Sequence, residues 1–325
     1  PVSAVLSGVL IKVSFFAMMR ILVTFRAAYM NDLLLWIGAA TALLAVIWAL
    51  AQSDAKRLLA YHSISQMGYI LAAFGAATAI STTVAFAHAL HHALFKSLLF
   101  IVAGTAISMT GTRDLYKMEP IGRRAPLLAV SFLAGALSIA GVPPFNGFAS
   151  KQLISQALAG HPAYALLWVT AVGTTASFIK ISRIVMPARR AAGDGPPGAP
   201  DGVASPTHAR TRRPSPLVTV PVVVLAILCL ATGIFARPLA EVLAGLLAAS
   251  PVGSDAAAIP ATFFTGTKLA GALPILGLGI GLYLLIRTPL GGRAAHRIER
   301  VAPELRTVLL FFVFGLGIFT LVAYL

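Results

Sequence analysis

The sequence predicts an all-α fold, a polytopic transmembrane helix bundle with about nine spans and one broken helix at 141–147. Of the 325 residues, 58% are apolar and only 11% are charged, whereas about a quarter of the residues are charged in an ordinary soluble domain. The mean hydropathy is +0.88. Because a bilayer offers the backbone no hydrogen-bond partners, apolar runs that cross it must be helices.

Nine apolar runs are long enough to cross roughly 30 Å of hydrocarbon, which takes about 20 residues in a helix. In chain order they are 2–26, 32–51, 58–80, 83–108, 125–158, 163–186, 216–236, 263–287 and 305–325. The run 125–158 is too long for one straight span, and Gly141, Pro143, Pro144 and Gly147 lie near its centre. Since proline removes a backbone donor, we expect the helix to break there.

The basic residues of the loops follow an alternating pattern. They gather in 52–57, 109–124, 187–215 and 288–304, whereas 27–31, 81–82, 159–162 and 237–262 contain only Arg237. By the positive-inside rule, this pattern predicts an integral protein of a bacterial plasma membrane, with the residue 1 side cytoplasmic and the Leu325 side outside. The basic residues behind the net charge of +15 thus lie in alternate loops and do not form one binding patch, so we expect no nucleic-acid partner.

The chain divides into a membrane block 1–186, an Arg/Pro/Gly-rich cytoplasmic linker 187–215 and C-terminal transmembrane helices 216–325. Residues 237–262 hold a short apolar run that we expect to form a turn of helix rather than a tenth span. The spans after the linker are almost entirely apolar, so we expect function to lie before residue 187. Because the chain begins with Pro1, we expect it to be a fragment that lacks an N-terminal part.

Five basic side chains lie inside the predicted spans, where charge is expensive. They are Lys12, His88, His92, Lys96 and Lys151. An ionisable group at the centre of a span costs about 2.5–3.5 kcal/mol, so such groups usually face a polar interior and mark an ion pathway. His88, His92 and Lys96 recur every fourth residue, which predicts one shared helix face along which protons can pass. The alternative is that they only hydrogen-bond neighbouring helices.

The surroundings of the lysines suggest different roles. No carboxylate lies at membrane depth, so we expect the acidic partner of Lys12 to come from the missing N-terminal part or from another subunit. Lys151 follows the predicted break and either gates one end of a pathway or reaches toward headgroups. Lys180 lies close to the end of its span, which favours snorkelling of its ammonium group to the surface.

A polar group opens the third span and forms either a hydrated opening to the cytoplasm or a helix-packing contact. It consists of Tyr61, His62, Ser65 and Gln66. The single cysteine, Cys229, lies in an apolar span, which excludes a thiolate metal cluster. We therefore expect no metal site, no cofactor and no catalytic residue in this chain.

Four segments carry a family resemblance. They are 1–13 (PVSAVLSGVLIKV), 54–69 (DAKRLLAYHSISQMGY), 88–100 (HALHHALFKSLLF) and 141–151 (GVPPFNGFASK). Together they resemble the antiporter-like subunits of respiratory complex I (NADH:quinone oxidoreductase), Mrp-type Na⁺/H⁺ antiporters and membrane-bound hydrogenases. The resemblance covers roughly residues 1–186.

The resemblance implies a proton-translocating domain over 1–186, made of the last helix of a first five-helix repeat and the whole of a second, inverted repeat. It also implies a chain of protonatable groups, with Lys12 as a central lysine and Lys151 as the terminal lysine on the broken helix. His88, His92 and Lys96 would continue the axis between them.

Two hypotheses of function follow. The first is a subunit that translocates H⁺, with or without exchange for Na⁺, beside lipid and other membrane subunits of a hetero-oligomeric complex. The second is a non-conducting structural subunit whose buried polar groups serve helix packing and assembly. The chain has no active site of its own, and whether it belongs to an oxidoreductase, a hydrogenase or an antiporter stays open.

Overall fold

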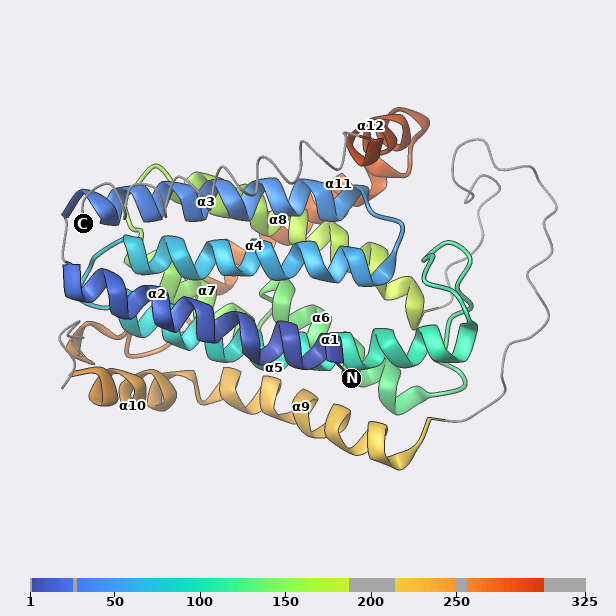
Figure 1. The fold of residues 1–325 in the computed structure, drawn as a ribbon, viewed down its shortest axis with the longest axis horizontal. Coiled ribbons are helices and arrows are strands. Elements are labelled where there is room, and N and C mark those ends of the chain that lie inside the picture. The colour runs from blue at the N-terminus through green and yellow to red at the C-terminus, as the bar shows by residue number, and fades with distance from the viewer. Residues whose placement is uncertain (1, 26–27, 187–213, 249–255, 301–325) are drawn as a thin grey trace.

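A computed structural model describes residues 2–25, 28–186, 214–248 and 256–300. This part of the chain consists of helices joined by loops and turns, and it contains no β-strand. Most of the long helices run side by side along the longest axis of the molecule (Figure 1). The predicted all-α bundle is therefore confirmed.

The membrane block before residue 187 follows the predicted spans closely. Its elements are α1 (Val2–Val5), the π-helix η1 (Leu6–Leu10), α2 (Ile11–Phe25), α3 (Ala28–Ala51), α4 (Ala55–Gly75), α5 (Ser81–Thr110), α6 (Pro126–Ala140), α7 (Asn146–Ala157), α8 (Tyr164–Ile181) and the short 3-10 helix η2 (Ser182–Ile184). The first predicted span is the continuous series α1, η1 and α2. The fifth is the pair α6 and α7.

The C-terminal part contributes α9 (Pro216–Ile234), α10 (Ala236–Ala248), the 3-10 helix η3 (Ala256–Ala258), α11 (Gly266–Ile286) and α12 (Pro289–Arg300). The helix α10 is too short for a tenth span, as predicted, but it has several turns rather than one. The predicted loop 288–304 is wrong in its first part, where α12 forms. A search for apolar runs misses α12 because this helix is strongly polar on one side. The predicted span 305–325 and most of the linker 187–215 lie outside the described residues.

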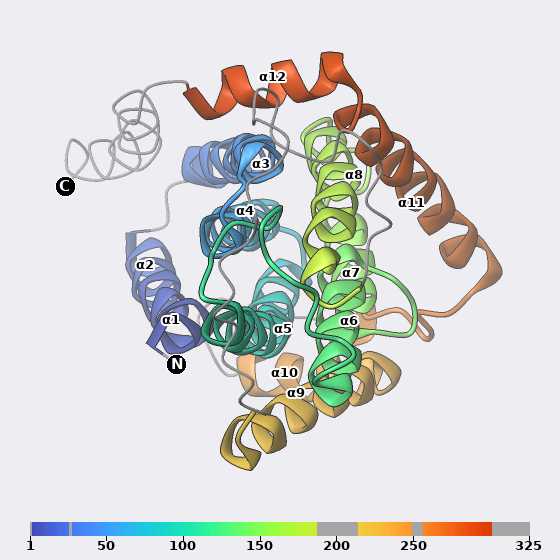
Figure 2. The same ribbon diagram turned by 90° about the vertical axis from the view of Figure 1, so that its right-hand side faces the viewer.

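Six helices of the described chain are long and apolar enough to cross a membrane. They lie at Ser3–Arg20, Met30–Ala51, Ser81–Thr110, Tyr164–Ile184, Pro216–Ile234 and Gly266–Ile286, with Pro126–Ala140 as a shorter apolar helix. The helix α4 is long enough but carries many polar side chains. It lies between α3 and α5 and is largely buried (Figure 2).

The helix α3 packs very closely against α4. A Cβ added at Gly38 would overlap the backbone of Ala72, and one added at Gly68 would overlap the backbone of Ala42. Glycine at these two positions therefore allows backbone-to-backbone contact, as small residues do at helix interfaces in membranes. Figure 2 shows α3 to α8 gathered in the centre, with α2, α9, α10 and α11 on the outside.

Local sequence signals explain several helix ends. The Asp54 side chain caps α4 by accepting hydrogen bonds from the backbone N–H groups of Lys56 and Arg57 at 2.7 and 2.9 Å. At the other end of the next helix, Gly111 adopts a left-handed conformation with φ of +73° and terminates α5. The loops that follow α3 and α5 lie at the same end of the bundle (Figure 1), as the alternating basic loops require. That this end faces the cytoplasm stays a prediction.

Candidate functional site

The break in the fifth span lies where the sequence predicts it. The helix α6 ends at Ala140, Gly141 turns the chain with a left-handed φ of +80°, and α7 begins at Asn146. Pro143 and Pro144 lie between the two helices and are joined by a cis peptide bond. The predicted broken helix is therefore confirmed, and it leaves backbone carbonyls of the last turn of α6 without helical partners.

Gly147 allows the two halves of the broken span to meet. A Cβ at this position would overlap the carbonyl oxygen of Ser138. The Ser138 hydroxyl also donates a hydrogen bond to the side-chain oxygen of Asn146. The start of α7 is thus held against the end of α6, and its direction is fixed by these contacts.

Lys151 uses a carbonyl that the break sets free. Its Nζ atom donates to the backbone oxygen of Ile139 at 2.8 Å and lies 5.6 Å from the centre of the Tyr69 ring. The Tyr69 hydroxyl in turn donates to the Leu167 carbonyl at 2.6 Å, which fixes the ring against α8. Lys151 is therefore solvated by protein dipoles and an aromatic face rather than by a carboxylate.

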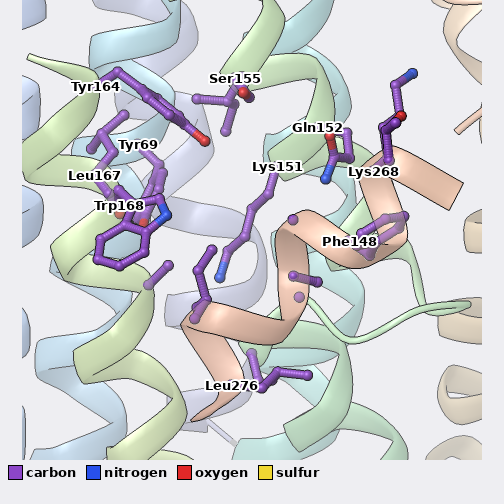
Figure 3. A pocket seen from close by; sticks show the side chains of 18 residues that line it. Tyr69, Phe148, Lys151, Gln152, Ser155, Tyr164, Leu167, Trp168, Lys268 and Leu276 are labelled. Carbon is purple, nitrogen blue, oxygen red and sulfur yellow. The ribbon is translucent and has the colours of Figure 1, made fainter. Parts of the chain in front are cut away.

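A cavity of about 290 Å³ opens beside Lys151, between α7, α8 and α11. Figure 3 shows the Lys151 side chain directed toward Trp168 of α8, with Tyr164 above it. The helix α11 closes the other side, and Lys268 at the rim turns away, since its Nζ donates to the Thr262 carbonyl at 2.8 Å. The expectation that function lies before residue 187 stays a prediction, and α11 forms a wall of the space around Lys151.

His88 connects three helices. Its Nδ1 atom lies 2.9 Å from the Ser150 hydroxyl on α7, and its Nε2 atom lies 3.2 Å from the Gln66 side-chain oxygen on α4. The side chain is completely buried. His88 thus contacts α7 at Ser150, the residue before Lys151.

His92 and Lys96 continue the same face of α5, and both are completely buried. Neither ring nitrogen of His92 has a hydrogen-bond partner within the described part of the chain. The Nζ atom of Lys96 donates to the Leu59 carbonyl of α4 at 2.6 Å and lies 5.5 Å from the centre of the Phe100 ring. The predicted polar stripe therefore points into the bundle, toward α4 and α7.

Lys12 reaches the same region from the outside helix. Its Nζ atom donates to the Ser7 carbonyl within the π-helical turn that precedes it. The Ser7 hydroxyl lies 2.6 Å from the Ser63 hydroxyl, which donates to the Leu59 carbonyl at 3.1 Å. Lys12 and Lys96 are consequently connected through these two hydroxyls and the carbonyls of Ser7 and Leu59.

The predicted opening on α4 is mostly buried. Tyr61 is partly exposed, and its ring lies 6.2 Å from that of Trp48. His62, Ser65 and Gln66 are completely buried, and Ser65 donates to the Ala42 carbonyl at 2.9 Å, a contact that holds α4 to α3. These contacts do not test proton uptake at this point, which stays a prediction.

The snorkelling prediction for Lys180 is wrong. The side chain is only 4% exposed, and its Nζ donates to the Leu50 carbonyl at 2.7 Å. Leu50 lies in the last turn of α3, where carbonyls lack helical partners. A neighbouring helix end therefore satisfies the ammonium group inside the protein.

Sequence reasoning missed several side chains that link the lysines and histidines. Ser7, Ser150 and Asn146 were not candidates, yet Asn146 is completely buried and its side-chain nitrogen donates to the Thr232 hydroxyl at 3.0 Å. Serine occurs often in membrane helices as a packing residue, so its identity alone gives little signal. The described residues contain no group of three or more His, Cys, Asp or Glu side chains that could hold a metal ion.

Comparison with known proteins defines the class. Residues 1–179 match the family described as NADH:quinone oxidoreductase/Mrp antiporter, transmembrane. The chain belongs to this family and is an integral membrane protein. The resemblance seen in the four sequence segments is thereby confirmed.

Individual relatives come from different members of this family. Hydrogenase-4 component B of Escherichia coli is 32% identical over 87% of this chain and 46% of its own length. A Na(+)/H(+) antiporter subunit of Alkalihalophilus pseudofirmus is 38% identical over 46% of this chain and 31% of its own length. The chain thus spans less than half the length of these relatives.

A solved structure shares the fold. A chain in the structure of the Mrp complex from Dietzia sp. DQ12-45-1b superposes with a TM-score of 0.67 and 25% sequence identity. The match covers 89% of this chain and 31% of that chain. It therefore extends beyond the membrane block into the C-terminal helices.

Proposed function

We propose that this chain translocates protons across the membrane as one subunit of a multi-subunit complex. The path would run laterally through the centre of the bundle, from Lys12 by way of Lys96, His92 and His88 to Lys151. The observation that carries the proposal is the buried stripe of α5, where short polar contacts join Lys96 to α4 and His88 to both α4 and α7. Buried ionisable groups in a membrane protein usually mark an ion pathway, because their insertion is costly.

The first part of the path depends on hydroxyl groups. The Ser7 and Ser63 hydroxyls, 2.6 Å apart, lie between the carbonyl that holds Lys12 and the one that holds Lys96. A hydroxyl both donates and accepts a hydrogen bond, so it can take part in proton transfer without changing charge. Each lysine donates to a backbone carbonyl and not to a hydroxyl, so proton exchange between the two lysines would also need bridging water at this point.

The second part depends on imidazoles. His92 lies one helical turn from Lys96 and one turn from His88, about 6 Å in each case. Its ring nitrogens have no partner in the described chain, which leaves them available to bridging water. From His88, the Ser150 hydroxyl leads to α7, where the next residue, Lys151, borders the cavity; water would have to complete the step to Lys151, and the cavity would connect the path to one membrane surface.

The proposed partners are H⁺, lipid and neighbouring membrane subunits. The relatives named as subunits or components of larger assemblies support the last point. We further propose that the end of the bundle with the basic loops faces the cytoplasm of a bacterial plasma membrane. The carboxylate that would switch Lys12 is proposed to come from outside the described residues, since Lys12 forms no ion pair within them.

Proton flux in membrane vesicles that contain the intact complex tests this function. Lys151→Ala and Lys12→Ala should each lower flux at least about tenfold, because proton transfer by a positioned group contributes a factor of 10²–10⁴. Assembly of the complex should be retained. Lys268→Ala is the matched control, since this lysine lies at the rim of the same cavity but bonds to the Thr262 carbonyl. Flux equal to wild type in both test variants would rule out the proposed path.

One observation favours the structural alternative. Lys96 and Lys180 both donate to backbone carbonyls of neighbouring helices, as cross-links between α5 and α4 and between α8 and α3. If the subunit is purely structural, substitutions in the buried polar groups should weaken assembly of the complex and leave proton flux per assembled complex unchanged. The two hypotheses are thus separated by measuring flux and assembly on the same samples.

The exchanged ion requires its own measurement. A relative named as a Na(+)/H(+) antiporter subunit makes Na⁺ exchange a specific alternative to proton movement alone. Proton flux that depends on an opposing sodium gradient would support exchange. Flux that is unaffected by sodium would support movement of H⁺ alone.

A further inference from the structure

The helix α8 carries a buried polar stripe that the proposed path does not use. Thr170, Thr174, Ser177 and Lys180 are spaced by four, three and three residues, so they share one side of the helix. All four are at most 4% exposed. Such a row of buried hydroxyls ending in a lysine is unusual in a span, where the remaining residues are mostly apolar.

The hydroxyls of the stripe differ in how they are satisfied. Thr170 and Thr174 donate to backbone carbonyls one turn earlier, at 2.7 and 2.8 Å. The Ser177 hydroxyl is buried and has no hydrogen-bond partner in the described residues. An unpaired buried hydroxyl costs about 1–3 kcal/mol unless it meets water. Ser177 therefore marks a point one turn from Lys180 where water has a polar site to bind.

His62 lies opposite this part of α8. Its ring centre is 4.9 Å from that of Phe178, the residue that follows Ser177. The imidazole is completely buried, and neither nitrogen has a partner among the described residues. The helix α4, which carries it, packs against both α5 and α8. His62 is thus placed between the central stripe of α5 and the polar stripe of α8.

Lys180 also lies near the end of the bundle where α3 ends. It is held by the last turn of α3 through Leu50, and α12, which carries Glu299, packs against α3. Glu299 is only partly buried, so it has access to solvent. The helix α12 crosses this end of α3 (Figure 2). An acidic group at the surface is therefore placed near a buried lysine, which in turn lies near a buried histidine.

We propose that Lys180 and His62 are further proton-carrying residues, which connect the α12 end of the bundle to Lys96 in the central path. The inference rests on the proposed function. In each step one N–H bond breaks and another forms: the Lys180 ammonium gives a proton to a neutral His62 nitrogen through water, and His62 passes one to the Lys96 amine. The Lys180 amine then regains a proton from the solvent side, where Glu299 collects it.

Two substitutions of Lys180 separate proton transfer from structural support. Lys180→Arg keeps a cation that donates to the Leu50 carbonyl, but arginine does not release its proton in proteins. Lys180→Met removes the charge and retains most of the volume. Proton flux should fall at least about tenfold in both variants, as expected for loss of a positioned proton carrier. Thermal unfolding of the Arg variant should match that of the wild type.

The control is Lys117→Met, which removes a lysine from the exposed loop at the same end of the bundle. Its flux should equal that of the wild type. Wild-type flux in Lys180→Arg would show that Lys180 is an anchor between α3 and α8 and would overturn the inference. If Lys180→Met fails to assemble, Lys180→Arg alone decides the question.

Failure of this inference is distinguishable from failure of the proposed function. If Lys151→Ala abolishes flux and the Lys180 variants leave it intact, the central path stands and the connection through α8 is wrong. If neither set of variants changes flux, the chain does not conduct protons and both proposals fail. Loss of flux in both sets supports both proposals.

Discussion

The Nδ1 atom of His88 lies 2.9 Å from the hydroxyl oxygen of Ser150, so the polar stripe of α5 and the second half of the broken span are in direct contact. The same hydroxyl is within 3.2 Å of the Asn146 carbonyl oxygen at the start of α7. A serine hydroxyl has one proton and two acceptor sites, so it can serve both neighbours. The break in the helix therefore positions Ser150 as well as the adjacent Lys151.

We expect Ser150→Ala to lower proton flux with little effect on folding. The substitution removes the hydroxyl between His88 and the Lys151 region, so proton transfer would need an additional water. One lost hydrogen bond costs about 0.5–1.5 kcal/mol of stability, which a folded complex tolerates. Flux in vesicles and thermal unfolding should be measured together. Thr105→Val is the control, because the Thr105 hydroxyl only donates to the Ile101 carbonyl of its own helix, and an equal flux loss there would contradict a specific role for Ser150.

Much of the architecture was predictable because it depends on local signals. The length of the apolar runs predicts the spans. Gly141, Pro143 and Pro144 predict the break, since these residues interrupt a helix whatever surrounds it. The spacing of His88 and His92 gave a shared face, because helical geometry fixes that relation without tertiary structure. The structure bears out six of the predicted spans within the described residues and the position of the break.

Other features could not be predicted because they depend on which helices become neighbours. The position of Lys180 near a span end favoured snorkelling, but only the packed structure brings the free carbonyl of Leu50 to its ammonium group. Ser7 became relevant through Ser63, which is 56 residues away in the sequence. The wall that α11 forms beside Lys151 has no signal in its almost uniformly apolar sequence.

Gly147→Ala should destabilise the protein by about 1–3 kcal/mol, the usual cost of forcing a group into a filled space. The added methyl group would overlap the Ser138 carbonyl, so α7 would have to move away from α6. Gly104→Ala in the middle of α5 is the control, because no atom lies within 4 Å of the added group there. The midpoint of thermal unfolding in detergent checks both variants, and equal midpoints would contradict the close contact at the break.

A third prediction concerns α9, which supports the break from the C-terminal part of the chain. Gly233 lies so close to the segment between α6 and α7 that a Cβ would overlap the Pro144 carbonyl oxygen. We expect Gly233→Ala to lower both the unfolding midpoint and the flux, because a displaced break would move Lys151. Gly281→Ala in α11, where the added group meets open space, should change neither. Unchanged flux in Gly233→Ala would show that the position of α9 does not matter for the path.

His92 allows the two hypotheses of function to be tested at a single residue. Its imidazole is buried without a hydrogen-bond partner in the described chain, so it contributes no cross-link whose loss would weaken the fold. Replacing an unpaired buried polar group by an apolar one of similar size is close to neutral or stabilising. We therefore expect His92→Leu to retain assembly and thermal stability while flux falls at least about tenfold, as for loss of a proton carrier.

Ser65→Ala provides the opposite case. The Ser65 hydroxyl donates to the Ala42 carbonyl between α4 and α3, so its loss should cost about 1 kcal/mol of stability. Unchanged flux per assembled complex would favour a packing contact over a hydrated opening at this point of α4. The structural hypothesis predicts normal flux per assembled complex for His92→Leu. Measured side by side, the two variants distinguish a buried histidine that carries protons from a buried polar group that holds helices together.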